Sequence, residues 1–556
     1  MKKHFVLLLA LCISALVTFA QKELVGLPYS FTQKSISQQV DNIAMPAVDK
    51  TTLLQEDEEH YVKGELLRVG VVHQTRYTFD NCGRTDILPD GGKLWRANFQ
   101  SEGAILMSVI FDKFNLPEEG KMYIYSPDHE QVYGPYTNDD IQSVGKMVTD
   151  DIEGEEIVVE YYEPANASFH GEVEISEITH LYRDIFQAKR VSEEKGPWGT
   201  AEGNCHINVV CPEGNGWLHP INSVVCILIT SGNAQYLCSG AMINNVRMDK
   251  TPYVLSANHC VNSVNQTHKF YFQYQTSTCY GNEGTYRFMA NGGNIVARSN
   301  TNSSLYQSSD FLLLKITGNL GMSYRDNIVF SGWDRTGAFS IGAAIHHPGG
   351  DWKKISLPAS IADITGGQLA NKFFDVKWRV NNNKGVTEPG SSGSPLFNAN
   401  KLIIGTLTSG SSACNKLNGE DVYGKMSYHW NNDGTSNPAL KLQPWLDPDN
   451  TGTTVLPGIK YDGTIVTDVH DYELRNSTFE VSPNPTSNGI VTIQGDFLHE
   501  NAVCNIYNVM GQLVMSCDVT TEATFTMNLS HLDNGVYIMN ILGSSRNYKS
   551  KLIIAK

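Results

Sequence analysis

The apolar side chains of this chain fall in short runs that are separated by turns rich in glycine and proline. Such runs predict β-strands, whereas the spacing of three and four residues that marks an amphipathic helix is rare. Between residues 21 and 195 the runs lie at 66–72, 104–111, 122–126 and 157–162, with turn signals at 89–92 and 117–120. We predict that this region is β-rich and forms a β-sandwich. A carbohydrate-binding sandwich is an alternative that rests on fold analogy alone.

The rest of the chain divides into further parts. Residues 196–455 again combine short apolar runs with glycine-rich turns, and residues 456–477 form a linker rich in glycine, threonine and aspartate. Residues 478–556 then make up a compact β unit. The chain has 556 residues, of which 41% are hydrophobic, so it can build about three domains with cores of their own.

The first twenty residues have the pattern of a secretory signal peptide. Met1–His4 include two lysines, residues 5–19 are mainly apolar, and the small residue Ala20 follows. A charged start, an apolar core and a small residue at the end are typical of a cleaved signal. No later run of 18 apolar residues occurs, so we predict an exported protein without a membrane-spanning helix.

Charge is distributed unevenly along the chain. Residues 21–195 contain 16 basic and 32 acidic residues, a balance of −16 that equals the formal charge of the whole chain. This asymmetry indicates separate modules. It fits a soluble acidic surface, or an acidic segment that covers a site for cationic side chains. No basic patch is present that could neutralise phosphates, so we predict no nucleic-acid partner.

Three residues of the types found in hydrolytic triads stand beside apolar runs. His259 follows the run 253–257, Asp310 precedes the run 311–314, and Ser392 lies in a turn made of glycines, serines and prolines. A hydroxyl in such a turn can stand clear of the backbone beside free N–H groups. The order His, Asp, Ser is that of the chymotrypsin-like proteases, and it differs from the orders in subtilisin and in the α/β-hydrolases.

The stretches around these residues resemble the trypsin-like serine endopeptidases, and the bacterial lysyl endopeptidases in particular. The similarity covers about residues 199 to 455 and is carried by 256–260, 309–313, 390–395, 205–212, 332–335, 345–348, 385–390 and 445–448. It implies a mainly β protein in which residues 196–455 form a chymotrypsin-like double β-barrel. Trp95–Arg96, Gly103–Ala104 and 116–126 look like parts of the pro-domains of these enzymes, so residues 21–195 are expected to be a propeptide.

The resemblance also implies a role for each residue of the site. Ser392 is expected to attack the peptide carbonyl and form an acyl-enzyme, while His259 takes the hydroxyl proton and later returns it to the leaving amine. Asp310 orients His259 and stabilises its charged form. The N–H groups of Gly390 and Ser392 form the oxyanion hole. Ser391 and Ser394 are the alternative serines, and this chemistry needs neither a cofactor nor a metal.

Asp421 corresponds to the acidic residue that binds the substrate cation in lysyl endopeptidases. A buried carboxylate opposite an ammonium group is a partner that a neutral side chain cannot replace. The predicted substrates are therefore proteins and peptides with lysine before the scissile bond. A solvated loop acid is the alternative interpretation of Asp421, and the neighbouring Glu420 is expected to be a bystander.

Three departures from the related enzymes bear on control and rate. Ser391 stands where animal trypsin-like zymogens have an aspartate that pairs with the freed N-terminus, so that activation switch is absent. We therefore expect control to rest on removal of the propeptide. Val386 stands where trypsin has its specificity carboxylate. Thr408 replaces a histidine that lysyl endopeptidases stack on a tryptophan, and residues 361–369 contain no tryptophan.

Seven of the eleven cysteines lie in the expected protease domain of an exported chain, where disulfides persist. Spacing alone leaves fifteen pairings of six cysteines open. The resemblance implies the pairs Cys205–Cys414, Cys211–Cys279 and Cys238–Cys260. Cys226, inside an apolar run, is expected to be buried and unpaired. The cysteine spacing does not favour zinc, and His346–His347 is expected to be structural.

The C-terminal unit resembles the sorting domain of the type IX secretion system. Residues 482–486, 506–512, 532–537 and 549–556 carry this similarity. It implies export across the outer membrane by the secretion machinery, removal of the domain, and a final location at the cell surface or in the medium. A small adhesive sandwich is the alternative. Cys504 and Cys517 could pair within this unit.

The strand pattern stops between residues 185 and 204, which indicates an exposed linker. If the enzyme cleaves after lysine, the bonds at Lys195–Gly196 or at Lys189–Arg190 are its own substrates, and we hypothesise self-activation there. Three classes of function follow from the sequence: a lysine-specific serine endopeptidase, an endopeptidase of the same fold with another preference, such as glutamate, and a catalytically silent surface adhesin. The three complete motifs favour the first class.

Overall fold

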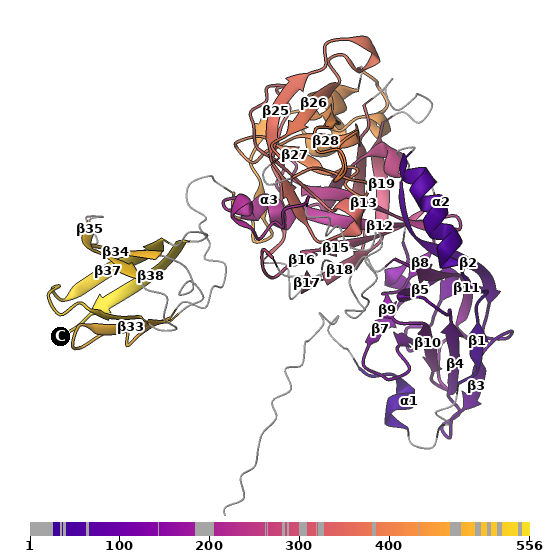
Figure 1. Cartoon of the computed structure of the whole chain (residues 1–556). Coiled ribbons are helices and arrows are strands. Elements are labelled where there is room, and N and C mark those ends of the chain that lie inside the picture. Colours follow the sequence, from indigo (N-terminus) through magenta and orange to yellow (C-terminus); the bar gives the residue numbers. More distant parts are fainter. Residues whose placement is uncertain are drawn as a thin grey trace, which may run out of the picture. The chain divides into compact units, whose positions relative to one another are not determined.

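The computed structural model is mainly β, as the sequence predicts (Figure 1). It describes residues 26–33, 36, 40–62, 66–142, 144–183, 205–261, 263, 265–280, 284–285, 288–299, 309–318, 320, 327–380, 385–432, 434–466, 480–494, 502–508, 513–519, 525–542 and 547–556. The signal peptide and both expected processing points lie outside these residues. The chain forms two compact units, one within residues 1–209, 219–277 and 281–466, and the other within 210–218, 278–280 and 467–556.

Residues 42–181, termed the pro-region after their expected role, fold into two β-sheets. The first sheet consists of β1 (Asn42–Ala44), β3 (Arg84–Ile87), β4 (Lys93–Gln100), β6 (Lys121–Tyr125), β7 (Val132–Tyr136) and β10 (Glu156–Glu163). The second consists of β2 (Leu67–Tyr77), β5 (Leu106–Asn115), β8 (Met147–Val148), β9 (Ile152–Glu153) and β11 (Glu172–Leu181). Helices α1 (Tyr29–Thr32) and α2 (Lys50–Val62) were not evident from the hydrophobic pattern.

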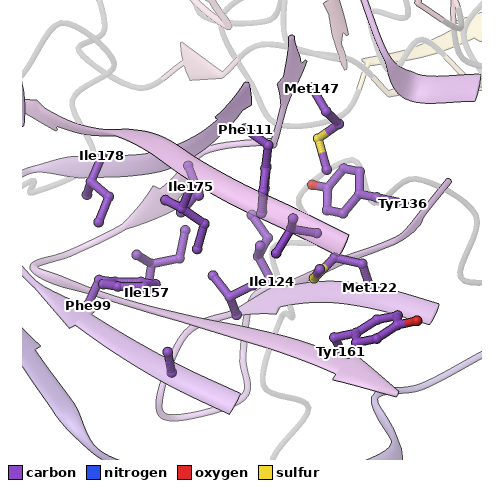
Figure 2. Close-up of a cluster of buried hydrophobic side chains, with 14 of the residues drawn as sticks. Phe99, Phe111, Met122, Ile124, Tyr136, Met147, Ile157, Tyr161, Ile175 and Ile178 are labelled. Atoms are coloured by element: carbon purple, nitrogen blue, oxygen red, sulfur yellow. The ribbon is translucent and has the colours of Figure 1, made fainter. Parts of the chain in front are cut away.

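Alternate side chains of the two sheets meet in one hydrophobic core. Figure 2 shows Phe99 of β4 and Ile157 of β10 facing Phe111 of β5 and Ile175 of β11, and all four side chains are fully buried. Each strand places every second residue on the same face, which is why an alternating pattern builds such a core. The pro-region is therefore a β-sandwich.

The second sheet of the sandwich continues into the first barrel of residues 196–455, the expected protease domain. Strand β2 pairs with β11 on one edge and with β13 (Ala234–Ile243) on the other, where Val71 lies opposite Ala234 and Leu67 opposite Leu237. A hydrophobic cluster covers this junction and includes Val69, Leu106 and Leu181 of the pro-region with Leu228, Leu237 and Trp352 of the protease domain. The pro-region thus docks by β-strand addition onto the outer face of this barrel.

A buried ion pair completes the junction. Asp151 of the pro-region accepts a hydrogen bond from Lys269 Nζ at 2.5 Å and another from the hydroxyl of Tyr271. The Asp151 and Lys269 side chains are only 6% and 4% exposed. This acid therefore pairs with a barrel lysine.

Replacing Asp151 by alanine is expected to lower the free energy of unfolding by about 3 to 5 kcal/mol, because Lys269 would keep a buried charge without its partner. Urea unfolding in a Ser392→Ala background, in which self-digestion is prevented, measures this change. The matched control is Glu172→Gln, which breaks an ion pair with Lys113 whose side chains are 59% and 55% exposed. That variant should lose no more than about 1 kcal/mol, and an equal loss in both variants would contradict the assignment.

The first barrel is one curled sheet of seven strands. Its order is β18-β15-β12-β13-β14-β20-β19, and the two edge strands follow each other in the chain through Gly292. The bounds are β12 (Val224–Ser231), β14 (Tyr253–Ser256), β15 (Thr267–Phe272), β18 (Phe288–Asn291), β19 (Gly293–Arg298) and β20 (Leu312–Ile316). On β12, Val225, Ile227 and Ile229 face the barrel core, whereas Cys226 and Leu228 face the pro-region. This two-sided burial explains the continuous apolar run.

His268 on β15 makes the stability of this unit sensitive to acid. Its ring is buried, and burial lowers the pKa of His268 to about 4. The unfolded chain takes up this proton near pH 6.5 and the folded chain does not, so the free energy of unfolding falls as pH drops from 6.5 towards 4. We expect this group to account for about 1.4 kcal/mol per pH unit in that window. Urea unfolding at pH 7.5, 6 and 5 should show a shallower decline for His268→Gln, and equal slopes would contradict the prediction.

The second barrel is built in the same way. Its sheet order is β24-β23-β27-β28-β29-β26-β25, and the edge strands β24 and β25 are consecutive in the chain. The bounds are β22 (Trp333–Asp334), β23 (Ala343–His346), β24 (Lys354–Ser356), β25 (Pro358–Asp363), β26 (Phe373–Trp378), β27 (Pro395–Phe397), β28 (Ile403–Gly410), β29 (Glu420–Lys425) and β30 (Val455–Leu456).

Short elements accompany the two barrels. They are β16 (Gln275–Thr276), β17 (Gly284–Thr285), β21 (Val329–Phe330) and β31 (Ile459–Lys460), with helices α3 (Leu218–Ser223), α4 (Met426–Asn431) and α5 (Gln443–Leu446). In the part of the chain that the structure covers, no helix is both long and apolar enough to cross a membrane.

The C-terminal residues form two small sheets around a core of their own. One sheet has the order β32-β33-β36 and the other β35-β34-β37-β38. Their bounds are β32 (Glu480–Ser482), β33 (Ile490–Gln494), β34 (Ala502–Asn508), β35 (Leu513–Val519), β36 (Phe525–Asn528), β37 (Gly535–Leu542) and β38 (Asn547–Ile554). Cys504 and Cys517 lie opposite each other on β34 and β35 and are not joined by a disulfide.

Candidate active site

His259 and Asp310 meet because their strands pair. His259 follows β14, Asp310 precedes β20, and the antiparallel pairing of these strands places Ser256 opposite Leu312. Asp310 Oδ2 lies 2.7 Å from His259 Nδ1, and Asp310 Oδ1 accepts a hydrogen bond from the His259 backbone N–H at 2.9 Å. The Asp310 side chain is 1% exposed and that of His259 is 18% exposed.

This geometry determines which nitrogen of His259 can act as a base. An ionised carboxylate only accepts hydrogen bonds, so the proton of the neutral imidazole resides on Nδ1. The Nε2 lone pair is then free to take a proton from another group. The buried carboxylate would also stabilise the imidazolium that results.

Ser392 lies in the turn that precedes β27. The turn is held by backbone hydrogen bonds from Ser391 N to Glu388 O at 3.0 Å and from Gly393 N to Leu407 O at 2.9 Å. The carbonyl of Ser392 accepts a hydrogen bond from Ser239 N at 2.8 Å and lies 4.0 Å from the sulfur of Cys260, the neighbour of His259. The turn of the second barrel is therefore docked against the first barrel beside His259.

The Ser392 side chain is not in hydrogen-bond contact with His259 in the described chain. Catalytic hydrogen bonds are often long in unliganded enzymes and tighten when the substrate binds. The structure thus joins two of the three expected triad residues directly and places the third in the adjacent turn.

Several backbone N–H groups of the turn have no acceptor among the described residues, and two of them bear on the expected chemistry. They belong to Gly390 and Ser392, the residues expected to form the oxyanion hole. Gly390 has a φ of +95°, and a Cβ there would lie 2.8 Å from the carbonyl oxygen of His347. Only glycine fits this position, and its carbonyl is held by the Ser239 hydroxyl at 2.9 Å.

Asp421 lies buried beneath the end of β28. Strand pairing sets Asp421 opposite Gly410, where a Cβ would lie 1.9 Å from Asp421 Oδ1. Its oxygens accept hydrogen bonds from Trp378 Nε1 at 2.6 Å, Thr387 Oγ1 at 2.5 Å, and Ser412 Oγ and N at 2.6 and 3.2 Å. Thr387 belongs to the turn that carries Ser392. The carboxylate therefore lies close to the catalytic turn.

All four donors to Asp421 are neutral, and no cation pairs with it in the described chain. Burial raises the pKa of Asp421, and the hydrogen bonds from Ser412, Thr387 and Trp378 oppose that shift. A buried carboxylate without a counter-ion favours the binding of a cationic group. Sequence reasoning missed Trp378 and Ser412 because nothing in their local pattern marks them.

Val386 and Thr408, the two other positions at which the sequence differs from related proteases, have structural roles. Val386 is fully buried in the core of the second barrel. Thr408 is 4% exposed, and its hydroxyl has no hydrogen-bond partner within the described residues. Neither residue adds a charge to the site.

The structure contains the three disulfides that the resemblance implies, Cys205–Cys414, Cys211–Cys279 and Cys238–Cys260. Cys226 is buried and unpaired. Cys205 and Cys414 lie in one cluster with His206 and Glu388, but the disulfide removes the two thiolates that a metal ion would need. The cluster thus anchors the segment around residue 206 beside the catalytic turn.

The two barrels, with Asp310 hydrogen-bonded to His259 beside the turn of Ser392, have the arrangement expected of a chymotrypsin-like serine protease. Residues 199–424 match the family described as lysyl endopeptidase, C-terminal domain, and residues 480–555 match the secretion system C-terminal sorting domain. The central part of the chain is therefore similar to the lysyl endopeptidases. The sorting domain indicates export to the cell surface or beyond.

The individual proteins that resemble this chain share less than 30% of their aligned residues with it. A lysyl endopeptidase of Pseudomonas aeruginosa is 28% identical over 282 residues, which are 47% of this chain and 56% of that protein. The match thus spans about half the length of the relative. A thermostable serine protease from an extremophilic microorganism is 12% identical, with 37% of this chain and 92% of that one covered at a TM-score of 0.28. Protease Anisep from Arthrobacter nicotinovorans is 15% identical, with 40% and 93% covered at 0.30. Likenesses this low carry no functional argument.

Proposed function

We propose that this chain is a secreted serine endopeptidase that hydrolyses peptide bonds on the carboxyl side of lysine. The observation that carries the proposal is the buried Asp421 carboxylate, which has no counter-ion among the described residues and lies beside the turn that bears Ser392. The family of residues 199–424 supports the same assignment.

The first half of the reaction uses the base created by Asp310. Ser392 Oγ attacks the carbonyl carbon of the scissile bond while His259 Nε2 takes the hydroxyl proton. The carbonyl oxygen becomes an oxyanion, which the free N–H groups of Gly390 and Ser392 stabilise. Each such donor is typically worth about 3 to 4 kcal/mol in the transition state.

The second half releases the products. His259 gives its proton to the leaving amine, the C–N bond breaks, and an acyl-enzyme remains on Ser392. Water then attacks this ester while His259 takes its proton; the ester C–O bond breaks, His259 returns the proton to Ser392 Oγ, and the carboxylic acid leaves. Because every proton passes through His259, we expect activity to be lost when that residue is protonated.

The lysine side chain would extend beneath Gly410 towards Asp421. Its ammonium group supplies the positive charge that the neutral donors do not. A glutamate side chain would place a second negative charge beside Asp421, and a phenylalanine would leave the carboxylate unpaired. Both should be rejected.

The test compares the processed protein on peptide amides that end in Lys, Arg, Glu and Phe. We expect kcat/KM for the Lys amide to exceed that for the Glu and Phe amides by about 10⁴-fold, as for a site built around one polar group. Preferred cleavage after Glu or Phe would contradict the pocket. Absence of cleavage by the processed protein would favour a surface adhesin.

Export by the type IX machinery completes the proposal. The sorting domain of residues 480–555 is the part that this machinery would bind and remove. The pro-region and the protease domain share a continuous sheet, so the pair would be exported as one folded body.

A further inference from the structure

His346 is a fully buried histidine in the second barrel that the proposed reaction does not use. It ends β23, and both of its ring nitrogens are hydrogen-bonded to serines. Nδ1 lies 2.8 Å from Ser391 Oγ, and Nε2 lies 2.9 Å from Ser356 Oγ. Ser391 is the residue directly before the proposed nucleophile, so His346 is hydrogen-bonded to the turn that carries Ser392.

Hydrogen-bond accounting fixes the tautomer of His346. The single hydroxyl proton of Ser356 goes to the carbonyl of Val386 at 3.2 Å, so Ser356 Oγ must accept from His346 Nε2–H. In the neutral ring Nδ1 is then an acceptor, and it receives the hydroxyl proton of Ser391. The Ser391 oxygen in turn accepts from the Glu388 backbone N–H at 3.3 Å. In this series of hydrogen bonds each hydroxyl and ring N–H donates once, and all the bonds run in the same direction, from Glu388 N–H to the Val386 carbonyl.

The environment keeps His346 neutral. Burial lowers its pKa well below 6.5, and His206, His347 and Lys354 add to this effect. A second proton on the ring would sit on Nδ1 and face Ser391, whose hydroxyl proton would then lose its acceptor. These hydrogen bonds form a relay that runs from Glu388 N–H through Ser391, His346 and Ser356 to the Val386 carbonyl. This arrangement is the one compatible with a buried, uncharged ring.

The relay joins both limbs of the catalytic turn. One end holds the Val386 carbonyl on the entering limb, and the other holds Ser391 between the two N–H groups of the oxyanion hole. The residues that follow His346 bind the same turn from outside, since Gly349 N donates to Pro389 O at 2.7 Å. His347 N donates to Ser239 Oγ at 3.0 Å, and this hydroxyl holds the Gly390 carbonyl.

We propose that His346, acting through Ser391, is the positioning residue that holds the oxyanion-forming turn in its catalytic shape. This inference rests on the proposed function and deepens it. The relay fills the place where a charged pair with a freed N-terminus would act in an animal zymogen. None of its bonds uses a chain terminus, so the turn is formed in the uncut chain as well as in the processed enzyme.

The experiment measures kcat and KM of the processed protein on a Lys amide for wild type, His346→Asn and His346→Gln. Asparagine can place an acceptor oxygen where Nδ1 lies, whereas glutamine reaches only the Nε2 position and leaves Ser391 without its acceptor. We expect His346→Gln to lower kcat about 10- to 100-fold with KM within about twofold, because a misplaced turn weakens oxyanion binding and leaves the Asp421 pocket intact. His346→Asn should recover a large part of the loss.

Two further variants distinguish a loss of positioning from a loss of folding. Ser391→Ala removes the link to the turn without altering the buried ring, and it should lower kcat in the same way. His268→Gln removes a buried histidine of the first barrel and should leave kcat unchanged at a similar cost in melting temperature.

The outcomes separate the two claims. An inactive wild type would contradict the proposed function and not the relay. An active wild type with unchanged kcat in His346→Gln and Ser391→Ala would overturn the relay. Equal losses in His346→Asn and His346→Gln that track their melting temperatures would also overturn it, because a purely structural histidine predicts that result.

Discussion

Replacing Ser392 by alanine is expected to lower kcat on a Lys amide by about 10⁵- to 10⁶-fold while the melting temperature stays within about 2 °C. The change removes the attacking oxygen and leaves the backbone bonds of the turn in place. Steady-state kinetics on the purified protein measure the effect, with residual product followed over days.

The matched control for this variant is Ser394→Ala. The Ser394 side chain is fully buried, and it lies two residues from the nucleophile. We expect it to keep activity within about tenfold of wild type. Loss of activity in the Ser394 variant together with full activity in the Ser392 variant would contradict the assignment of the nucleophile.

Asp421→Asn is expected to lower kcat/KM for Lys amides by about 10²- to 10³-fold, because the substrate ammonium would be buried opposite a neutral amide. Activity on a Phe amide should stay the same or rise, since the carboxylate no longer has to be buried unpaired. The comparison of kcat/KM on both amides measures the change in specificity separately from any loss of folding.

Glu420→Gln provides the matched control for the pocket. Glu420 is the neighbour of Asp421 on β29, but its exposed side chain pairs with Lys377 at 2.6 Å. We expect no change in specificity from it. An equal loss for Lys and Phe amides in Asp421→Asn would mean that Asp421 supports the fold and does not read the substrate.

The parts of this protein that the sequence predicts are local ones. Apolar runs between turns identify strands such as β5 and β10, because strand periodicity is visible within a few residues. Helix α2 was missed, since its sequence holds four consecutive acids at 56–59 and only a weak apolar stripe.

The pairing of β2 with β13 could not be predicted, because strands so far apart in the chain meet only through the whole fold.

The candidate site likewise contains parts that local sequence predicts and parts that only the whole fold creates. Each of the three motifs around His259, Asp310 and Ser392 is a short run with a recognisable resemblance. The relay through His346 and Ser391 has no recognisable sequence motif. The tautomer of His346 depends on Ser356 and Val386, which only the folded barrel brings together. A histidine pair in sequence indicates only burial or metal binding, and its partners decide the role.

The most direct test of the central claim is covalent labelling of the processed protein with a phosphonate that carries a lysine-like aminoalkyl side chain. Such a reagent reacts with a serine only where a base activates the hydroxyl and where the side chain finds its pocket. We predict a single adduct on Ser392, located by peptide mass, together with a much slower reaction of a phosphonate that carries a glutamate-like side chain. An adduct on another serine, or equal rates for the two reagents, would contradict a lysine-specific serine endopeptidase.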